Sequence, residues 1–101
     1  GDPIFLPRIL ADLAARGIGR LLVEGGTSIH TALLTAGLAD ELQLVMAPFF
    51  VGDSAAPRFV NDGAFPWTST NRATLAEVRQ IGDVVLHRYA LSDRFAWLGP
   101  A

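Results

Sequence analysis

The sequence predicts an α/β fold with a mostly parallel sheet, flanking helices and an antiparallel hairpin at its C-terminal end. The first observation is a short apolar strand at residues 20–24, which is followed by two glycines and an amphipathic helical pattern over residues 28–36. A second strand pattern at residues 42–47 follows closely, and strand–helix–strand order with short loops favours a right-handed parallel unit. Two β-rich runs, 73–80 and 84–91, flank a glycine turn and predict the hairpin.

The elements are predicted in the following order. A first helix ends at Gly17 and has prolines near its start. The strand that follows has an uninterrupted apolar centre, which is typical of a strand covered on both faces. The next helix takes its cap from Thr27 or Ser28 and ends at Gly37. The strand at 42–47 is expected to be mostly buried, and residues 49–67 form a long irregular loop.

The composition limits the possible classes of protein. A chain of 101 residues makes at most one domain. Half of the residues are hydrophobic and only 18% are charged, so we expect a surface that a missing part of the chain or a second subunit covers. The net charge of −2 does not favour nucleic acid as a partner, and no apolar run approaches the ~18 residues of a membrane span. Cysteine is absent and no signal peptide is visible, so we expect a cytoplasmic protein without thiolate metal sites or disulfides.

The turn between the first strand and the second helix carries the strongest functional signal. Glu24 ends an apolar strand, where a carboxylate must face a cleft or a hydrogen-bond donor. Gly25 and Gly26 have no Cβ, so they allow positive φ and the close approach of a ligand. The helix that begins near Thr27 and Ser28 presents free N–H groups that suit a phosphate. The alternative is a tight turn without a ligand, because neither the Rossmann nor the P-loop fingerprint is present.

A second segment is expected at the same rim of the sheet. Pro48 to Gly52 follows the strand at 42–47, and ligands of open α/β sheets bind beyond the carboxyl ends of the strands. The long loop contains four phenylalanines, for which packing onto the core is the favoured interpretation. They are Phe49, Phe50, Phe59 and Phe65.

The remaining polar residues do not form a complete catalytic set. His30 and His87 are isolated from other ligand-type residues, so a structural role is favoured for each and no metal site is predicted. Asp40 and Glu41 are interpreted as a solvated turn, or as a cap that pairs with arginine side chains. No lysine is present, which excludes Schiff-base chemistry. This composition favours a reaction in which a cofactor supplies the chemistry and the protein positions it.

The order of these motifs resembles the reductase domain of the bacterial bifunctional riboflavin biosynthesis protein, which has a dihydrofolate-reductase-like fold. The resemblance extends from residue 4 to residue 91. The motifs that carry it are Leu-Val-Glu-Gly-Gly at 22–26, Ala-Gly-Leu at 36–38, Asp-Glu-Leu at 40–42, Ala-Pro at 47–48 with Gly52, and Ile-Gly-Asp-Val-Val-Leu at 81–86 with Tyr89.

The resemblance implies that residues 1–101 are the C-terminal half of such a domain, whose N-terminal half is absent or is replaced by a second subunit. It implies a reductase that passes hydride from NADPH to the ribose C1 of 5-amino-6-(5-phosphoribosylamino)uracil, and usually a homodimer formed through the sheet. Gly25, Gly26, Thr27 and Ser28 would then approach the cofactor phosphates. Glu24 would lie beside the substrate and the nicotinamide, and Pro48 and Gly52 would border the cleft.

Two alternatives remain open at this point. The chain is either a catalytic reductase or a non-catalytic nucleotide-binding and dimerisation module. A reductase of the same fold with another acceptor, such as a pterin, is a further possibility. Arg58 and Arg72 are both available to bind the 2′-phosphate of NADPH.

Overall fold

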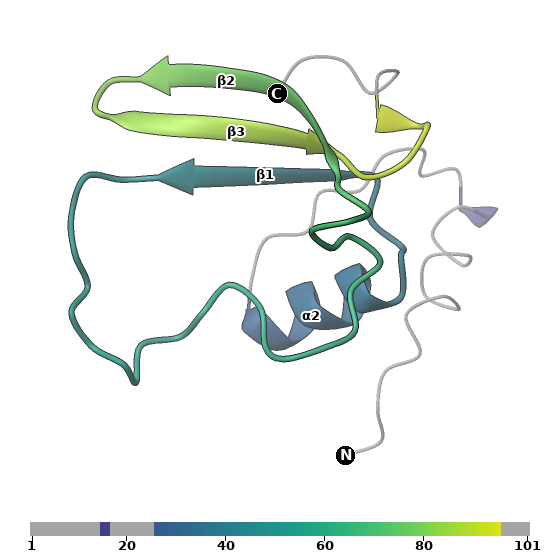
Figure 1. Ribbon diagram of the computed structural model, residues 1–101, viewed down its shortest axis with the longest axis horizontal. Helices are drawn as coiled ribbons and strands as arrows, with labels where there is room; N and C mark the ends of the chain where they lie inside the picture. The colour runs from purple at the N-terminus through teal and green to yellow at the C-terminus, as the bar shows by residue number, and fades with distance from the viewer. Residues whose placement is uncertain (1–14, 17–25, 96–101) are drawn as a thin grey trace.

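The structure, a computed structural model, describes residues 15–16 and 26–95 (Figure 1). Its elements there are helix α2 (Thr27–Thr35) and strands β1 (Glu41–Met46), β2 (Thr74–Ile81) and β3 (Val84–Ala90). The predicted strand at 20–24, nearly all of the predicted first helix, and the site residues Glu24 and Gly25 lie outside the described residues.

Helix α2 agrees with the prediction for residues 28–36. It ends in a Schellman motif, in which the N–H of Leu38 donates to Leu33 O at 3.0 Å and the N–H of Gly37 donates to Leu34 O at 3.2 Å. Gly37 has a φ of 66°, a conformation that a side chain would strain, so the glycine sets the end of the helix. The predicted side-chain cap is wrong, because the N-cap residue is Gly26 and no side chain caps the helix.

The three described strands form one sheet in the order β1-β3-β2. Both pairings are antiparallel, with Glu41 opposite Ala90 in one and Ile81 opposite Val84 in the other. The prediction of a mostly parallel sheet is therefore wrong for the described strands, although the α/β class and the C-terminal hairpin are confirmed. An apolar run indicates a strand but not its neighbour. Here the second strand of the hairpin pairs with β1, and the predicted parallel partner at 20–24 lies outside the described residues.

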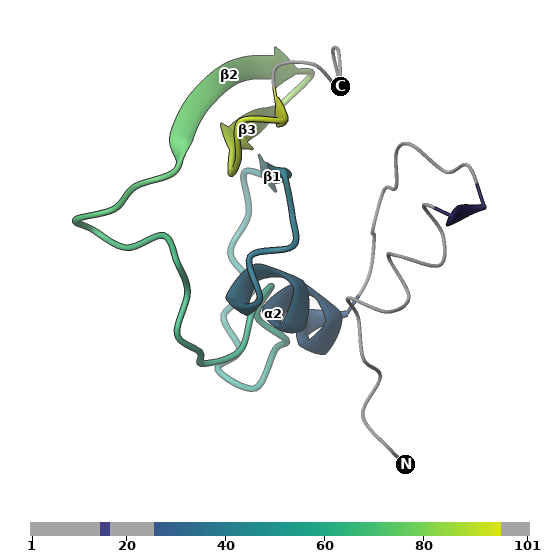
Figure 2. The ribbon, with the colours of Figure 1, turned by 90° about the vertical axis from the view of Figure 1, so that its right-hand side faces the viewer.

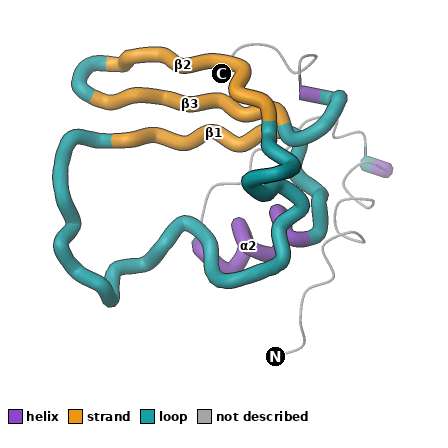
Figure 3. The backbone as a smooth tube through the Cα atoms, in the orientation of Figure 1, coloured by secondary structure: helices purple, strands orange, loops and turns teal. Residues whose placement is uncertain are grey.

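The long loop between β1 and β2 is irregular, as predicted (Figure 3). It leaves the end of β1, passes α2 and returns to the sheet at β2. In two perpendicular views α2 lies on the β1 side of the sheet (Figure 2). The loop and the helix therefore lie together at one edge of the sheet.

Few apolar side chains of the described residues are buried. Leu33, Leu34 and Leu86 form the buried core. The predicted burial of the strand at 42–47 is wrong, since none of these residues is buried and Met46 is 64% exposed. Packing of the loop phenylalanines onto the core is also wrong for Phe49, Phe50 and Phe59, which are 71%, 100% and 50% exposed. Neither face of the sheet is completely covered by the described residues.

One charged residue is buried within the sheet. Arg88 on β3 contacts Glu41 through Nε at 2.5 Å and Glu77 through Nη1 at 3.5 Å, and its guanidinium lies 5.1 Å from the centre of the Phe95 ring. A β-bulge between Leu75 and Glu77 places Glu77 directly opposite Arg88. The hydrogen bond to Glu41 raises the pKa of Arg88, although burial acts in the opposite direction. Of the two alternatives for Glu41, pairing with an arginine is confirmed and a solvated turn is wrong, because Glu41 begins β1 and its side chain is 10% exposed.

Candidate functional site

The start of α2 is the part of the predicted phosphate site that the structure describes. The N–H of His30 makes the first helical bond, to Gly26 O at 3.1 Å, so the N–H groups of the three preceding residues have no partner within the helix. No acidic residue lies in the first turn. This donor set, together with the helix dipole, fits a bound phosphate.

Gly26 is open to its surroundings. Its φ is −42° and its ψ is 155°, so the positive φ considered from the sequence is wrong at this position. A Cβ added to Gly26 would meet no protein atom within 4 Å. The described chain therefore does not itself require glycine here, and a ligand has room to approach the backbone.

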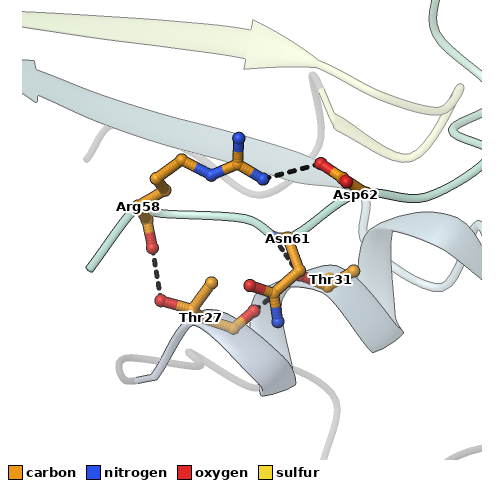
Figure 4. A network of polar contacts seen from close by, with 5 residues as sticks. All are labelled: Thr27, Thr31, Arg58, Asn61 and Asp62. Carbon is orange, nitrogen blue, oxygen red and sulfur yellow. Dashed lines mark hydrogen bonds and ion pairs between the residues drawn. The ribbon is translucent and has the colours of Figure 1, made fainter. Parts of the chain in front are cut away.

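The two hydroxyl groups at this end of the helix have different environments. The Thr27 hydroxyl donates a hydrogen bond to the backbone carbonyl of Arg58, far along the sequence (Figure 4). The Ser28 side chain is exposed. Of the two hydroxyls assigned to the cofactor, that of Ser28 is therefore the more accessible to a ligand.

The structure brings a loop segment to the helix that sequence reasoning missed. His30 Nδ1 lies 3.0 Å from Phe59 O, and the N–H of Asn61 donates to Thr31 Oγ1 at 2.7 Å (Figure 4). His30 thus has the structural role that was favoured for it. The only sequence signal for this contact was the placing of β-branched threonines four residues apart in the helix, at positions 27, 31 and 35.

The two candidate arginines lie in different surroundings. Arg58 is anchored at the start of α2 through its own carbonyl, and its Nη2 pairs with Asp62 Oδ1 at 2.8 Å. Both side chains of this pair are largely exposed, so the pair adds little stability and its partners exchange readily. Arg72 instead donates from Nε to Ser69 O at 3.1 Å, beside the start of β2. Arg58 is therefore the arginine that the structure links to the helix end.

The same segment lines an open hollow of about 650 Å³. Its walls come from a single stretch of the loop: Arg58, Phe59, Val60, Asn61, Asp62, Gly63 and Phe65. The hollow is wide open to solvent, and no described residue of α2 is among its lining residues. Arg58 lines this hollow, and its backbone carbonyl accepts the hydrogen bond from Thr27 at the start of α2.

Pro48 and Gly52 follow the end of β1. Gly52 has a φ of 69°, which explains the glycine by its backbone conformation alone. Both residues are exposed, and the end of β1 lies on the same side of the molecule as the start of α2 (Figure 1). No hydrogen bond among the described residues joins either of them to the helix.

Two further observations concern residues outside this site. His87 Nδ1 lies 3.3 Å from Leu44 O and its ring stacks on Tyr89 with centroids 6.3 Å apart, so it has a structural role. In the described part of the chain, no group of three His, Cys, Asp or Glu side chains is placed to hold a metal ion. Within the same ranges no helix has the length and hydrophobicity needed to cross a membrane.

Comparison with known proteins identifies the family. Residues 4–87 match the model of the RibD C-terminal domain. The chain is 39% identical over 64 residues to the riboflavin biosynthesis protein RibD of Bacillus amyloliquefaciens, a match that covers 63% of the chain and 17% of that protein. It is 31% identical over 84 residues to the 2,5-diamino-6-ribosylamino-4(3H)-pyrimidinone 5′-phosphate reductase of Methanothermobacter thermautotrophicus, covering 82% of the chain and 39% of that protein.

A solved structure agrees with this assignment. RibD of Acinetobacter baumannii superposes with a TM-score of 0.74 and 27% sequence identity, over 89% of the chain and 25% of that protein. The chain thus spans well under half the length of the relatives it matches. With residues 4–87 matched, this chain belongs to the RibD C-terminal domain family.

Proposed function

We propose that this chain is part of an NADPH-dependent reductase of riboflavin biosynthesis. The acceptor is the ribose C1 of a ribosylaminopyrimidine 5′-phosphate, specifically 5-amino-6-(5-phosphoribosylamino)uracil. The observation that carries the proposal is the family match over residues 4–87, because relatives in that family are named as reductases of a ribosylaminopyrimidinone phosphate. The free N–H groups and open backbone at the start of α2 support a dinucleotide as the second ligand.

When bound, NADPH would supply the hydride for the reduction at C1. The residues of this chain bind and orient the two ligands. Gly25, Gly26 and Ser28 approach the cofactor phosphates, and Thr27 contributes its backbone N–H. Each of these contacts is a hydrogen bond from a neutral donor to an anion, which is about twice as strong as a neutral pair.

Glu24 is assigned to the substrate and the nicotinamide. Opening of the sugar ring leaves positive charge on the C1–N unit, and a carboxylate beside it stabilises that charge in the transition state. Pro48 and Gly52 are assigned to the border of the substrate cleft. The cofactor and the substrate would then meet beside Gly25, at the end of the strand that the sequence predicts for residues 20–24.

Selective binding of NADPH over NADH tests the proposal directly. Calorimetric titration of the full native protein should give an affinity for NADPH at least about tenfold higher than for NADH, since a charged phosphate contact contributes about 1.5–3 kcal/mol. Equal affinities would show that the protein does not recognise the 2′-phosphate. If the protein binds neither dinucleotide, the proposed cofactor is contradicted.

Gly26→Ala is expected to weaken NADPH binding about tenfold while leaving the stability of the protein nearly unchanged. The added Cβ meets no described protein atom, so a loss of affinity with unchanged stability would indicate a clash with the ligand. Affinity is measured by calorimetry and stability by thermal unfolding. Gly82→Ala is a contrasting control, because its φ of 61° predicts lower stability at a turn remote from the helix. Unchanged NADPH affinity in Gly26→Ala would show that the cofactor does not approach this backbone.

A second candidate function is supported by the exposed sheet. Met46 on β1 and Val78 and Ile81 on β2 are each about half exposed or more, as in a surface that another chain or segment covers. We propose that the protein is a cytoplasmic homodimer whose sheet takes part in assembly. If gel filtration shows a dimer and the titration shows no dinucleotide binding, the assembly module replaces the reductase as the function.

A further inference from the structure

One face of α2 carries a row of three threonines. Thr27, Thr31 and Thr35 are spaced by four residues, so their side chains lie one above another along the helix. Threonine is a poor helix former because its branched side chain loses rotamer freedom. The presence of three threonines in a nine-residue helix is therefore best explained by contacts that they make outside the helix.

These contacts are made by the loop segment 58–63, which runs along the row of threonines from one end to the other. Arg58 O accepts a hydrogen bond from the Thr27 hydroxyl, and the Asn61 N–H donates to the Thr31 hydroxyl at 2.7 Å (Figure 4). At the far end, a Cβ on Gly63 would lie 2.7 Å from the Thr35 methyl carbon. Glycine at this position thus permits a contact closer than any side chain allows.

The middle threonine differs from the last one in its hydrogen bonds. The Thr31 hydroxyl donates to Thr27 O at 2.7 Å, which orients its lone pairs toward the incoming Asn61 N–H. Among the described residues, the Thr35 hydroxyl bonds only within the helix, to Thr31 O at 2.7 Å and Ala32 O at 3.4 Å. Thr31 is therefore the residue whose hydroxyl joins the helix and the loop at the centre of the row, and Thr35 provides a matched comparison.

We infer that Thr31 is a positioning residue for the cofactor site. It holds segment 58–63 against α2, and so keeps Arg58 and the walls of the hollow at the helix end to which the cofactor phosphates are assigned. The inference rests on the proposed function. Because segment and ligand share this end of the helix, holding the segment and binding the dinucleotide favour each other, and the coupling acts equally in both directions.

The test uses three variants of the full native protein. Thr31→Val removes the hydroxyl and keeps the branched shape, Thr31→Ser restores the hydroxyl, and Thr35→Val removes a hydroxyl that bonds only inside the helix. Hydrogen exchange of the Asn61 amide is measured without ligand. We expect exchange about five- to tenfold faster in Thr31→Val, as for the loss of one hydrogen bond, and near the native rate in the other two variants.

Affinity for NADPH is measured in the same set by calorimetry. Thr31→Val should bind NADPH about fivefold more weakly, and both Thr31→Ser and Thr35→Val should bind it as the native protein does. The amides of the β2–β3 hairpin serve as an internal reference for global stability, and their exchange should not change.

Each other result overturns part of the idea. Native exchange at Asn61 in Thr31→Val, or equally fast exchange in Thr35→Val, would show that Thr31 does not hold the segment. Faster exchange with unchanged NADPH affinity would show that the segment is held but plays no part in the cofactor site. Failure of the native protein to bind NADPH overturns the proposed function and the coupling together, while the exchange result still decides whether Thr31 holds the loop.

Discussion

Glu24→Gln is expected to lower kcat for reduction of the ribosylaminopyrimidine phosphate about 100-fold or more. The amide has the size of the carboxylate but no charge, so it no longer stabilises the positive charge that develops at C1 when the sugar ring opens. Losses of this size follow removal of one preorganised electrostatic contact from an active site. The measurement is the steady-state oxidation of NADPH by the full native protein.

The same variant should retain its circular dichroism spectrum, because the change falls on the transition state and not on the fold. Asp83→Asn is the matched control, since it removes one exposed carboxylate at the β2–β3 turn and should leave kcat unchanged. A native kcat in Glu24→Gln would exclude Glu24 from the mechanism.

Arg88→Met is expected to lower the free energy of unfolding by about 3 kcal/mol. The side chains of Arg88 and Glu41 are 7% and 10% exposed, so the variant leaves the Glu41 carboxylate nearly buried without its ion-pair partner. Breaking a buried pair from one side usually costs about 3–5 kcal/mol, and the partial exposure of Glu77 places this cluster at the lower end. Urea unfolding of the full native protein measures the effect.

Two further variants separate charge from packing. Arg79→Met removes an exposed arginine of β2 and should change stability by about 0.5 kcal/mol or less. Adding Glu41→Leu to Arg88→Met should recover much of the lost stability, because the nearly buried carboxylate of Glu41 is then removed and the carboxylate of Glu77 is partly exposed to water. The interpretation fails if Arg88→Met is no more destabilising than Arg79→Met.

The elements that the sequence predicts correctly are those set by neighbouring residues. Helix α2 ends where Gly37 takes a positive φ, and the hairpin turns at Gly82, which also has a positive φ. Both positions need glycine for a local reason, so the pattern of glycines between apolar runs was sufficient to locate them.

The direction of the strands could not be found in this way. Apolar runs mark β1 and β3 equally well whether they pair parallel or antiparallel, because the choice depends on which strand becomes the neighbour. The pairing of β1 with β3 brings Glu41, the first residue of the described sheet, opposite Ala90, which is its last residue in the sequence. Such a contact leaves no trace in the residues near either strand.

The candidate site shows the same division. The start of α2 was located from Gly26 and the helical pattern that follows it. The partner of the Thr27 hydroxyl was not, because Arg58 lies 31 positions away and its carbonyl carries no information about side-chain type. Burial of the loop phenylalanines was mispredicted for a related reason: an apolar side chain packs only where another segment comes to cover it, as the full exposure of Phe50 illustrates.

The uncovered sheet has a practical consequence for work with these residues in isolation. Val45, Met46 and Phe49 form a stretch of apolar side chains around the end of β1, each more than half exposed. Chaperones and fluorescent hydrophobic dyes recognise surfaces of this kind, and an unblunted β-strand with such neighbours is a template for aggregation. Expression trials should therefore begin with the longest natural polypeptide that contains the chain. Low fluorescence of a hydrophobic dye would then indicate that another segment or subunit covers the sheet.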